Sequence, residues 1–109
     1  KSQGVNIIMF SKDEAKRKAS DRFVLFPYGQ KVHSLIDVCI DLSDEWAAGQ
    51  TETSPRAQRK ALKSYLMERI DLKDPTKSYF VPSFVWTFLA KMIISWIIKW
   101  IINNYIIND

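Results

Sequence analysis

The chain has few of the residues on which most enzymes and cofactor-binding proteins depend. It contains one cysteine, Cys39, and one histidine, His33, in 109 residues. A single cysteine excludes a disulfide within the chain. The three glycines are isolated from one another, so the sequence has no glycine-rich phosphate-binding loop. These shortages favour a non-catalytic protein and predict no bound cofactor and no metal ion.

Charged residues are scarce in the C-terminal part of the chain. The sequence has 16 Lys and Arg and 12 Asp and Glu, and after residue 78 only Lys91, Lys99 and Asp109 are charged. The length suits a single domain with a modest core. We therefore predict a hydrophilic helical body at residues 1–78, followed by a hydrophobic C-terminal helix at residues 79–109.

The middle of the chain predicts two amphipathic helices. Residues 31–48 have apolar side chains at helical spacing and an acidic flank. Ser54 before Pro55 marks the start of a second helix, which ends near Ile70. We expect these helices to form an αα-hairpin in which the acidic flank attracts the basic flank of the second helix. Each exposed pair would contribute only about 0.5 kcal/mol.

The N-terminal part predicts three short elements. Residues 5–10 and 23–26 are apolar and rich in strand-forming residues, so each is interpreted as a strand. Between them, Ser11 and Glu14 have the spacing of a capping box at the start of a helix. The two strands and the helix could form a small βαβ-like unit. The predicted fold class is mainly α. It consists of a small helical body, with an αα-hairpin and room for two short N-terminal strands, followed by a long hydrophobic C-terminal helix.

The C-terminal segment is long and apolar enough for a transmembrane helix. As a helix, residues 79–105 would extend ~39 Å, compared with a hydrocarbon core of ~30 Å. Basic residues precede this segment and none follows Ile102, which predicts a single-pass membrane protein with its body on the cytoplasmic side. The residues predicted to contact the membrane interface or an anionic surface are Arg56, Arg59, Lys60, Lys63, Lys73, Lys77, Tyr79 and Tyr105.

Two lysines weaken the prediction of a lone span. The Ile, Leu, Val and Phe residues of this segment favour insertion by roughly 5 kcal/mol, but Lys91 near its centre costs ~3 kcal/mol. The polar residues occur at every fourth position and form a winding ridge on the helix, which other helices can pack against. Lysines inside membranes usually face a bundle interior or a cavity. We therefore predict a helix-association ridge made of Ser83, Thr87, Lys91, Ser95, Lys99 and Asn103.

Three placements of the C-terminal helix remain open at this stage. The favoured one is a small membrane-anchored structural or assembly protein, with membrane lipid or partner helices as its partners and a homo- or hetero-oligomeric state. The alternative is a soluble subunit of a large complex, for example a virion or phage structural component, which buries this helix against partner chains. Burial in the chain's own core is the least expected, because three Trp and six Ile seem too many for the first 78 residues to cover.

Other groups with chemical potential have simpler structural interpretations. His33, Asp37 and Asp41 are four residues apart on one helix, a spacing that can bind a metal, but a solvated polar face is favoured. Cys39 lies on the apolar face and is expected to be a small buried side chain. Basic clusters at 16–22 and 56–63 could meet anionic lipid or nucleic acid. Acidic residues nearby favour solvated helix flanks instead, so nucleic acid is not expected as a partner.

Overall fold

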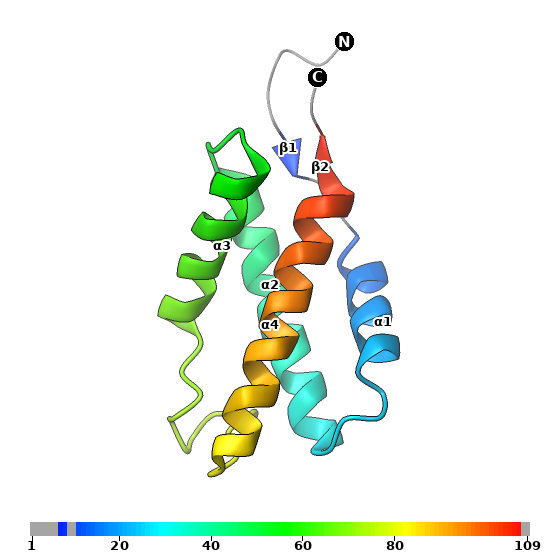
Figure 1. Ribbon diagram of the computed structural model, residues 1–109, viewed down its shortest axis with the longest axis vertical. Helices are drawn as coiled ribbons and strands as arrows, with labels where there is room; N and C mark the ends of the chain where they lie inside the picture. Colours follow the sequence, from blue (N-terminus) through cyan, green and yellow to red (C-terminus); the bar gives the residue numbers. More distant parts are fainter. Residues whose placement is uncertain (1–6, 9–10, 108–109) are drawn as a thin grey trace.

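The protein is mainly helical. A computed structural model of the chain describes residues 7–8 and 11–107, with side chains over residues 11–104. Within these residues the chain forms four helices, α1 (Lys12–Arg22), α2 (Gly29–Gly49), α3 (Pro55–Arg69) and α4 (Phe84–Tyr105). Two very short strands, β1 (Ile7–Ile8) and β2 (Ile106–Ile107), pair antiparallel, which brings the two ends of the described chain together (Figure 1).

The hydrophobic helix α4 is part of the helical body. In Figure 1 it lies in front of α2, between α3 on one side and α1 on the other, and it contacts all three helices. The helices α2 and α3 are joined by residues 50–54 and run in opposite directions. The predicted boundary at residue 78 lies in the loop between α3 and α4, and one core includes residues from both sides of it.

The starts of α1 and α3 are confirmed by their caps. The Ser11 Oγ accepts a hydrogen bond from the amide of Glu14 at 3.2 Å, and the Ser54 Oγ accepts one from the amide of Ala57 at 3.1 Å. Each bond satisfies an amide that has no partner within its helix. These local signals are strong enough to fix both starts without help from the rest of the fold.

The predicted strand at residues 23–26 is wrong. This segment is a turn that follows α1, in which the amide of Phe26 donates to the carbonyl oxygen of Phe23 at 3.0 Å. The two rings pack edge-on with centroids 4.8 Å apart, and the Phe23 ring lies 5.7 Å from the Trp96 ring of α4. Side chains three residues apart point to opposite faces of a strand, so this ring contact requires a turn.

The predicted βαβ-like unit is also wrong, because the segment expected to form its second strand is a turn. The strand β1 pairs with β2 at the far end of the chain and not with residues 23–26. Of the strand predicted at residues 5–10, Ile7 and Ile8 form β1, and the other residues lie outside the described part of the chain.

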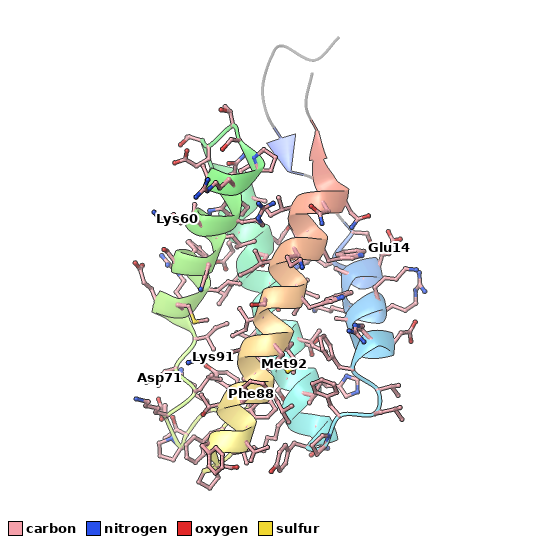
Figure 2. The ribbon with its side chains drawn as sticks, in the orientation of Figure 1. Glu14, Lys60, Asp71, Phe88, Lys91 and Met92 are labelled. Atoms are coloured by element: carbon pink, nitrogen blue, oxygen red, sulfur yellow. The ribbon has the colours of Figure 1, made fainter. Side chains whose placement is uncertain are left out.

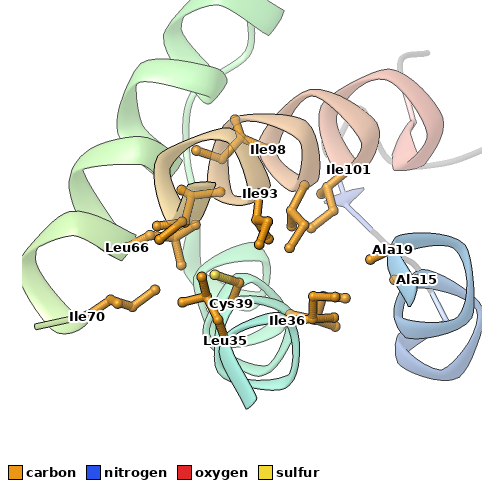
Figure 3. Close-up of a cluster of buried hydrophobic side chains, with 14 of the residues drawn as sticks. Ala15, Ala19, Leu35, Ile36, Cys39, Leu66, Ile70, Ile93, Ile98 and Ile101 are labelled. Carbon is orange, nitrogen blue, oxygen red and sulfur yellow. The ribbon is translucent and has the colours of Figure 1, made fainter. Parts of the chain in front are cut away.

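One side of α4 forms a large part of the hydrophobic core. We call this side the inner face; each of its residues is at most 1% exposed, and they are Trp86, Ala90, Ile93, Ile94, Ile97 and Ile101. In Figure 3, Ile93 and Ile101 lie opposite the buried side chains of α2, with residues of α3 and α1 on either side. The structure thus covers this face with the chain's own helices, which was the least expected of the three placements.

The cover comes from three helices that each contribute a narrow apolar stripe. The helix α2 supplies Leu35, Ile36 and Cys39, all fully buried, and α3 supplies Leu62 and Leu66. The helix α1 has only Ala15 and Ala19 to bury, and both are 0% exposed (Figure 3). Small side chains allow α1 to approach closely, so a short and mostly charged helix still covers part of the core.

The predicted attraction between the acidic flank of α2 and the basic flank of α3 is wrong for Asp37 and Asp41. These two carboxylates pair with lysines of α1 instead. An Asp41 carboxylate oxygen lies 3.3 Å from the Lys16 Nζ and 3.7 Å from the Lys12 Nζ, and Asp37 lies 3.9 Å from Lys16. Exposed pairs of this kind contribute little, so packing decides which flank is covered. The result is that Asp37 and Asp41 do not neutralise the cations of α3.

Candidate interaction face

The C-terminal part of the predicted helix-association ridge lies on the side of α4 that points away from the other helices. Lys91, Ser95, Lys99 and Asn103 are exposed, whereas Ser83 and Thr87 are half-buried. At 100° per residue, the row through Lys91, Ser95 and Lys99 falls opposite the inner face. These exposed residues of the ridge are not part of the buried core, and association of the ridge with another helix stays a prediction.

A row of exposed apolar side chains runs beside this polar row. Phe84 is 86% exposed, Phe88 64% and Met92 42%, and they are spaced four residues apart. Residues at this spacing lie one above another on a helix. Figure 2 shows Phe88, Lys91 and Met92 near one another on α4. We call the two rows together the outer face: Phe84, Phe88, Lys91, Met92, Ser95 and Lys99.

Sequence reasoning missed the apolar row of the outer face. The segment is apolar on most sides, so hydrophobic periodicity cannot separate side chains that the bundle covers from side chains that it leaves exposed. The only available signal was indirect: the neighbours of a lysine on the helix surface are expected to be exposed with it. Phe88 is such a neighbour of Lys91, three residues before it, and Met92 is such a neighbour of Ser95 and Phe88.

An open groove separates α4 from α1 along one edge of the outer face. It has a volume of about 450 Å³ and is lined by Arg22 and Phe23 of the α1 side and by Phe88, Lys91, Met92, Ser95, Trp96 and Lys99 of α4. The Arg22 guanidinium carbon lies 5.8 Å from the centroid of the Phe23 ring, a cation–π contact that holds this charge over the groove. Tertiary structure thus adds a cation of α1 to the lysines of α4.

A second open groove separates α4 from α3 along the other edge. Its volume is about 370 Å³, and it is lined by Arg59, Lys60 and Lys63 of α3 and by Ser95, Ile98 and Lys99 of α4. Three of the predicted surface-contact residues therefore lie beside two residues of the predicted ridge. Ser95 and Lys99 line both grooves, so the two grooves flank a common row of α4.

Both grooves have one sign of charge. None of the lining residues is acidic. Over residues 11–104, the ion pairs connect α1 with α2 and Glu68 with Arg69, and none involves the six cations of the grooves. The positive potentials of these side chains add, because no carboxylate among the described residues lies against them. The six cations are Arg22, Arg59, Lys60, Lys63, Lys91 and Lys99.

The remaining predicted contact residues lie in different environments. Arg56, Lys73 and Lys77 are exposed, the first in the first turn of α3 and the others in the loop between α3 and α4. Tyr79 is only 4% exposed, and its hydroxyl accepts a hydrogen bond from the amide of Asp71 at 3.3 Å, so it stabilises that loop from within. The side chain of Tyr105 lies outside the described residues.

The groups with metal-binding or nucleophilic potential are engaged elsewhere. Asp37 and Asp41 face the lysines of α1, and the His33 Nδ1 lies 3.4 Å from the Ser20 Oγ. Among the residues that the structure describes, no three His, Cys, Asp or Glu side chains form a group that could hold a metal ion. Burial raises the pKa of the Cys39 thiol, which keeps it protonated and unreactive in the core.

Over the described residues, one helix is long and apolar enough to cross a membrane. It spans Phe84–Asn104, and 44% of its most apolar stretch is buried in the bundle. The central helix of a soluble bundle has the same length and composition, so this finding is weak evidence for a span. In comparisons with known proteins, no family model, no curated protein and no solved structure matches the chain.

Proposed function

We propose that this protein is a small non-catalytic structural or assembly protein that attaches to an anionic membrane surface. Its bundle stays folded, and the outer face of α4 lies against the lipid headgroups. The observation that carries this proposal is the pairing of an exposed apolar row with a polar row on α4, with cations of α1 and α3 on both sides. The apolar side chains suit the boundary between headgroups and acyl chains, and the cations suit the anionic headgroups.

The apolar row is suited to shallow insertion. Side chains of surface-bound helices enter about 5–10 Å into the boundary between headgroups and acyl chains. Phe84 and Phe88, at 86% and 64% exposed, can enter this boundary while the bundle core stays intact. Bases of a nucleic acid stack on aromatic rings but gain little from Met92, so the presence of this side chain in the row favours lipid.

The cations supply the electrostatic part of the attachment. A Lys or Arg near an anionic lipid surface contributes about 1 kcal/mol. Six cations line the two grooves beside the outer face. Together they would contribute roughly 6 kcal/mol before the cost of orienting the protein at the surface. This attraction falls as salt concentration rises, because exposed charges are screened.

Attachment with a folded bundle is favoured over the predicted span by the burial of the inner face. Complete burial of one Ile side chain contributes about 1.5–3 kcal/mol, so Ile93, Ile94, Ile97 and Ile101 account for roughly 6–12 kcal/mol as an upper estimate. A lone span gains only about 2 kcal/mol from the sequence balance of apolar residues against Lys91. Withdrawing α4 from the bundle would expose the apolar stripes of the other helices.

A second candidate is a soluble subunit of a large assembly, with a partner chain on the outer face. It is favoured by the exposed apolar row, because large apolar side chains that gather on one surface commonly mark protein contacts. A protein partner for this face would need acidic side chains opposite the groove cations. The two candidates differ in whether lipid alone is sufficient for binding.

Vesicle co-sedimentation of the full chain tests the proposal. We expect binding to vesicles of phosphatidylcholine with phosphatidylglycerol, little binding to phosphatidylcholine alone, and release by high salt or alkaline carbonate. Retention on membranes through a carbonate wash would instead favour the single-pass anchor. Absence of binding to both kinds of vesicle, with a defined oligomer by light scattering in the absence of lipid, would favour the assembly subunit.

A further inference from the structure

The groove between α3 and α4 brings four cations around one hydroxyl group. Arg59, Lys60 and Lys63 come from two turns of α3, and Lys99 comes from the outer face of α4, one turn after Ser95. Figure 2 shows Lys60 on the side of α3 in the upper half of the molecule, away from Phe88 near the start of α4. Along α4, Phe84 and Lys99 are separated by ~22 Å, so this groove lies beyond the start of the exposed apolar row and near its Met92 end.

The arrangement places like charges close together, and over residues 11–104 none of these four cations has an ion-pair partner. Arg59 and Lys63 are four residues apart on α3, a spacing at which like charges repel each other. Three carboxylates of α2 make their contacts with residues other than the groove cations. Asp37 and Asp41 pair with the lysines of α1, and Glu45 accepts a hydrogen bond from the hydroxyl of Tyr65 on α3 at 3.2 Å. A bound anion would remove this repulsion.

We infer that this groove binds a phosphomonoester group. A phosphate dianion has several acceptor oxygens, and a guanidinium binds two of them side by side while ammonium groups add further charge-assisted hydrogen bonds. The Ser95 hydroxyl can donate to another oxygen. Ile98 lines the same groove and is only 5% exposed, so an apolar side chain excludes water from one side of the site and strengthens these interactions.

The phosphate can come from a small soluble molecule or from a lipid headgroup that ends in a monoester. The groove opens beside the same row of α4 that the proposed membrane attachment uses, since Ser95 and Lys99 line both grooves. The inference goes beyond that attachment, because binding of a soluble phosphate does not require a membrane.

Titration of the full chain with inorganic phosphate at constant ionic strength tests the site. We expect saturable binding of one phosphate per chain, detected by ³¹P NMR line broadening, and an increase in Tm that chloride does not produce. Arg59→Gln should weaken binding roughly tenfold, because it removes a charge-assisted bidentate contact. Arg17→Gln is the matched control; Arg17 is exposed on α1, and its variant should bind within about twofold of the wild type.

A second variant and a vesicle assay complete the test. Lys99→Gln should also weaken phosphate binding, and Lys99→Arg should restore it while both variants keep the wild-type circular dichroism. Vesicles with phosphatidic acid, a monoester, should bind more tightly than vesicles with phosphatidylglycerol, a diester, at equal surface charge if a headgroup is the source. Equal binding to both, together with saturable binding of free phosphate, assigns the site to a soluble ligand.

The inference is overturned if phosphate and chloride have the same effect on Tm, or if Arg59→Gln and Arg17→Gln weaken binding equally. Failure of membrane attachment has a different signature. In that case the protein binds no vesicles of either lipid, whereas the phosphate titration remains saturable and sensitive to Arg59→Gln.

Discussion

The inner and outer faces of α4 both contain big apolar side chains, yet these side chains have opposite environments. On the inner face, Ile93 and Ile97 are at most 1% exposed, and on the outer face Phe84 and Phe88 are 86% and 64% exposed. A large apolar side chain on α4 therefore does not by itself mark the buried face. Lys91 and Lys99 are exposed on the side that the other helices leave open, where their charged groups stay in contact with water.

The charged flanks of α2 and α3 also have different environments within the bundle. The acidic flank of α2 is covered by lysines of α1, so the basic flank of α3 keeps its charge and lines the groove against α4. The choice of helix neighbour for α2 thus leaves the cations of α3 in this groove without an ion pair among the described residues. The predictions below separate what the two faces of α4 contribute to stability and to binding.

The largest expected effect is on the inner face. Ile93→Ala should lower the free energy of unfolding by about 2–5 kcal/mol, because it leaves a cavity in a closely packed core. The matched substitution on the outer face, Met92→Ala, should change it by less than about 1 kcal/mol, since Met92 is 42% exposed. Urea unfolding followed by circular dichroism measures both. Equal losses would contradict the assignment of the two faces.

Removing charge from the outer face should affect binding and leave stability unchanged. The double variant Lys91→Gln/Lys99→Gln should weaken binding to anionic vesicles by roughly 30-fold, which corresponds to about 1 kcal/mol for each charge. It should also reduce the dependence of binding on salt concentration. Lys91→Arg/Lys99→Arg keeps both charges and should bind like the wild type. Loss of binding in the arginine variant would point to a role beyond charge.

The apolar row of the outer face should make a smaller contribution of a different kind. Phe88→Ser should weaken vesicle binding by roughly tenfold, because it removes one aromatic side chain from the headgroup boundary. Its salt dependence should remain that of the wild type, since no charge is lost. Co-sedimentation at two salt concentrations measures both quantities. A changed salt dependence would mean that Phe88 acts by holding the neighbouring Lys91 and not by insertion.

The smallest expected effects on stability come from replacing two serines, one buried and one exposed. Ser43 is fully buried, and its hydroxyl donates to the carbonyl oxygen of Cys39 at 2.7 Å, so Ser43→Ala should destabilise the fold by about 1 kcal/mol. Ser95 is exposed on the outer face, and Ser95→Ala should change stability by less than about 0.5 kcal/mol. It should weaken phosphate binding by about threefold through loss of one hydrogen bond. An unchanged phosphate affinity would show that Ser95 is not a ligand.

Local sequence signals predicted the helices well and the packing poorly. Ser11, Ser54 and Pro55 fixed helix starts because capping depends on residues three or four positions apart. The strand predicted at residues 23–26 failed because the same apolar letters suit a turn whose rings pack together and against Trp96. A contact between residues 23 and 96 is not encoded in any short window of the sequence.

The candidate site was likewise predictable only in part from the sequence. The polar row at every fourth residue, with Lys91 and Lys99 in it, was visible in the sequence, because an i, i+4 pattern has a direct geometric meaning on a helix. The grooves were not visible. They combine Lys99 with Arg59 of α3 on one side and Lys91 with Arg22 of α1 on the other, and these pairs come together only when three helices pack.

The sequence by itself determined that this protein is mainly helical, that its last helix is long and apolar, and that a polar row winds along that helix. Only the tertiary structure decided which side of the helix is buried, because an isolated helix that is apolar on most sides has no preferred inner face. The narrow apolar stripes of α2 and α3, and the two small alanines of α1, cover one side of α4 and leave the other. The face that remains uncovered brings together the cations and apolar side chains on which function is proposed to depend.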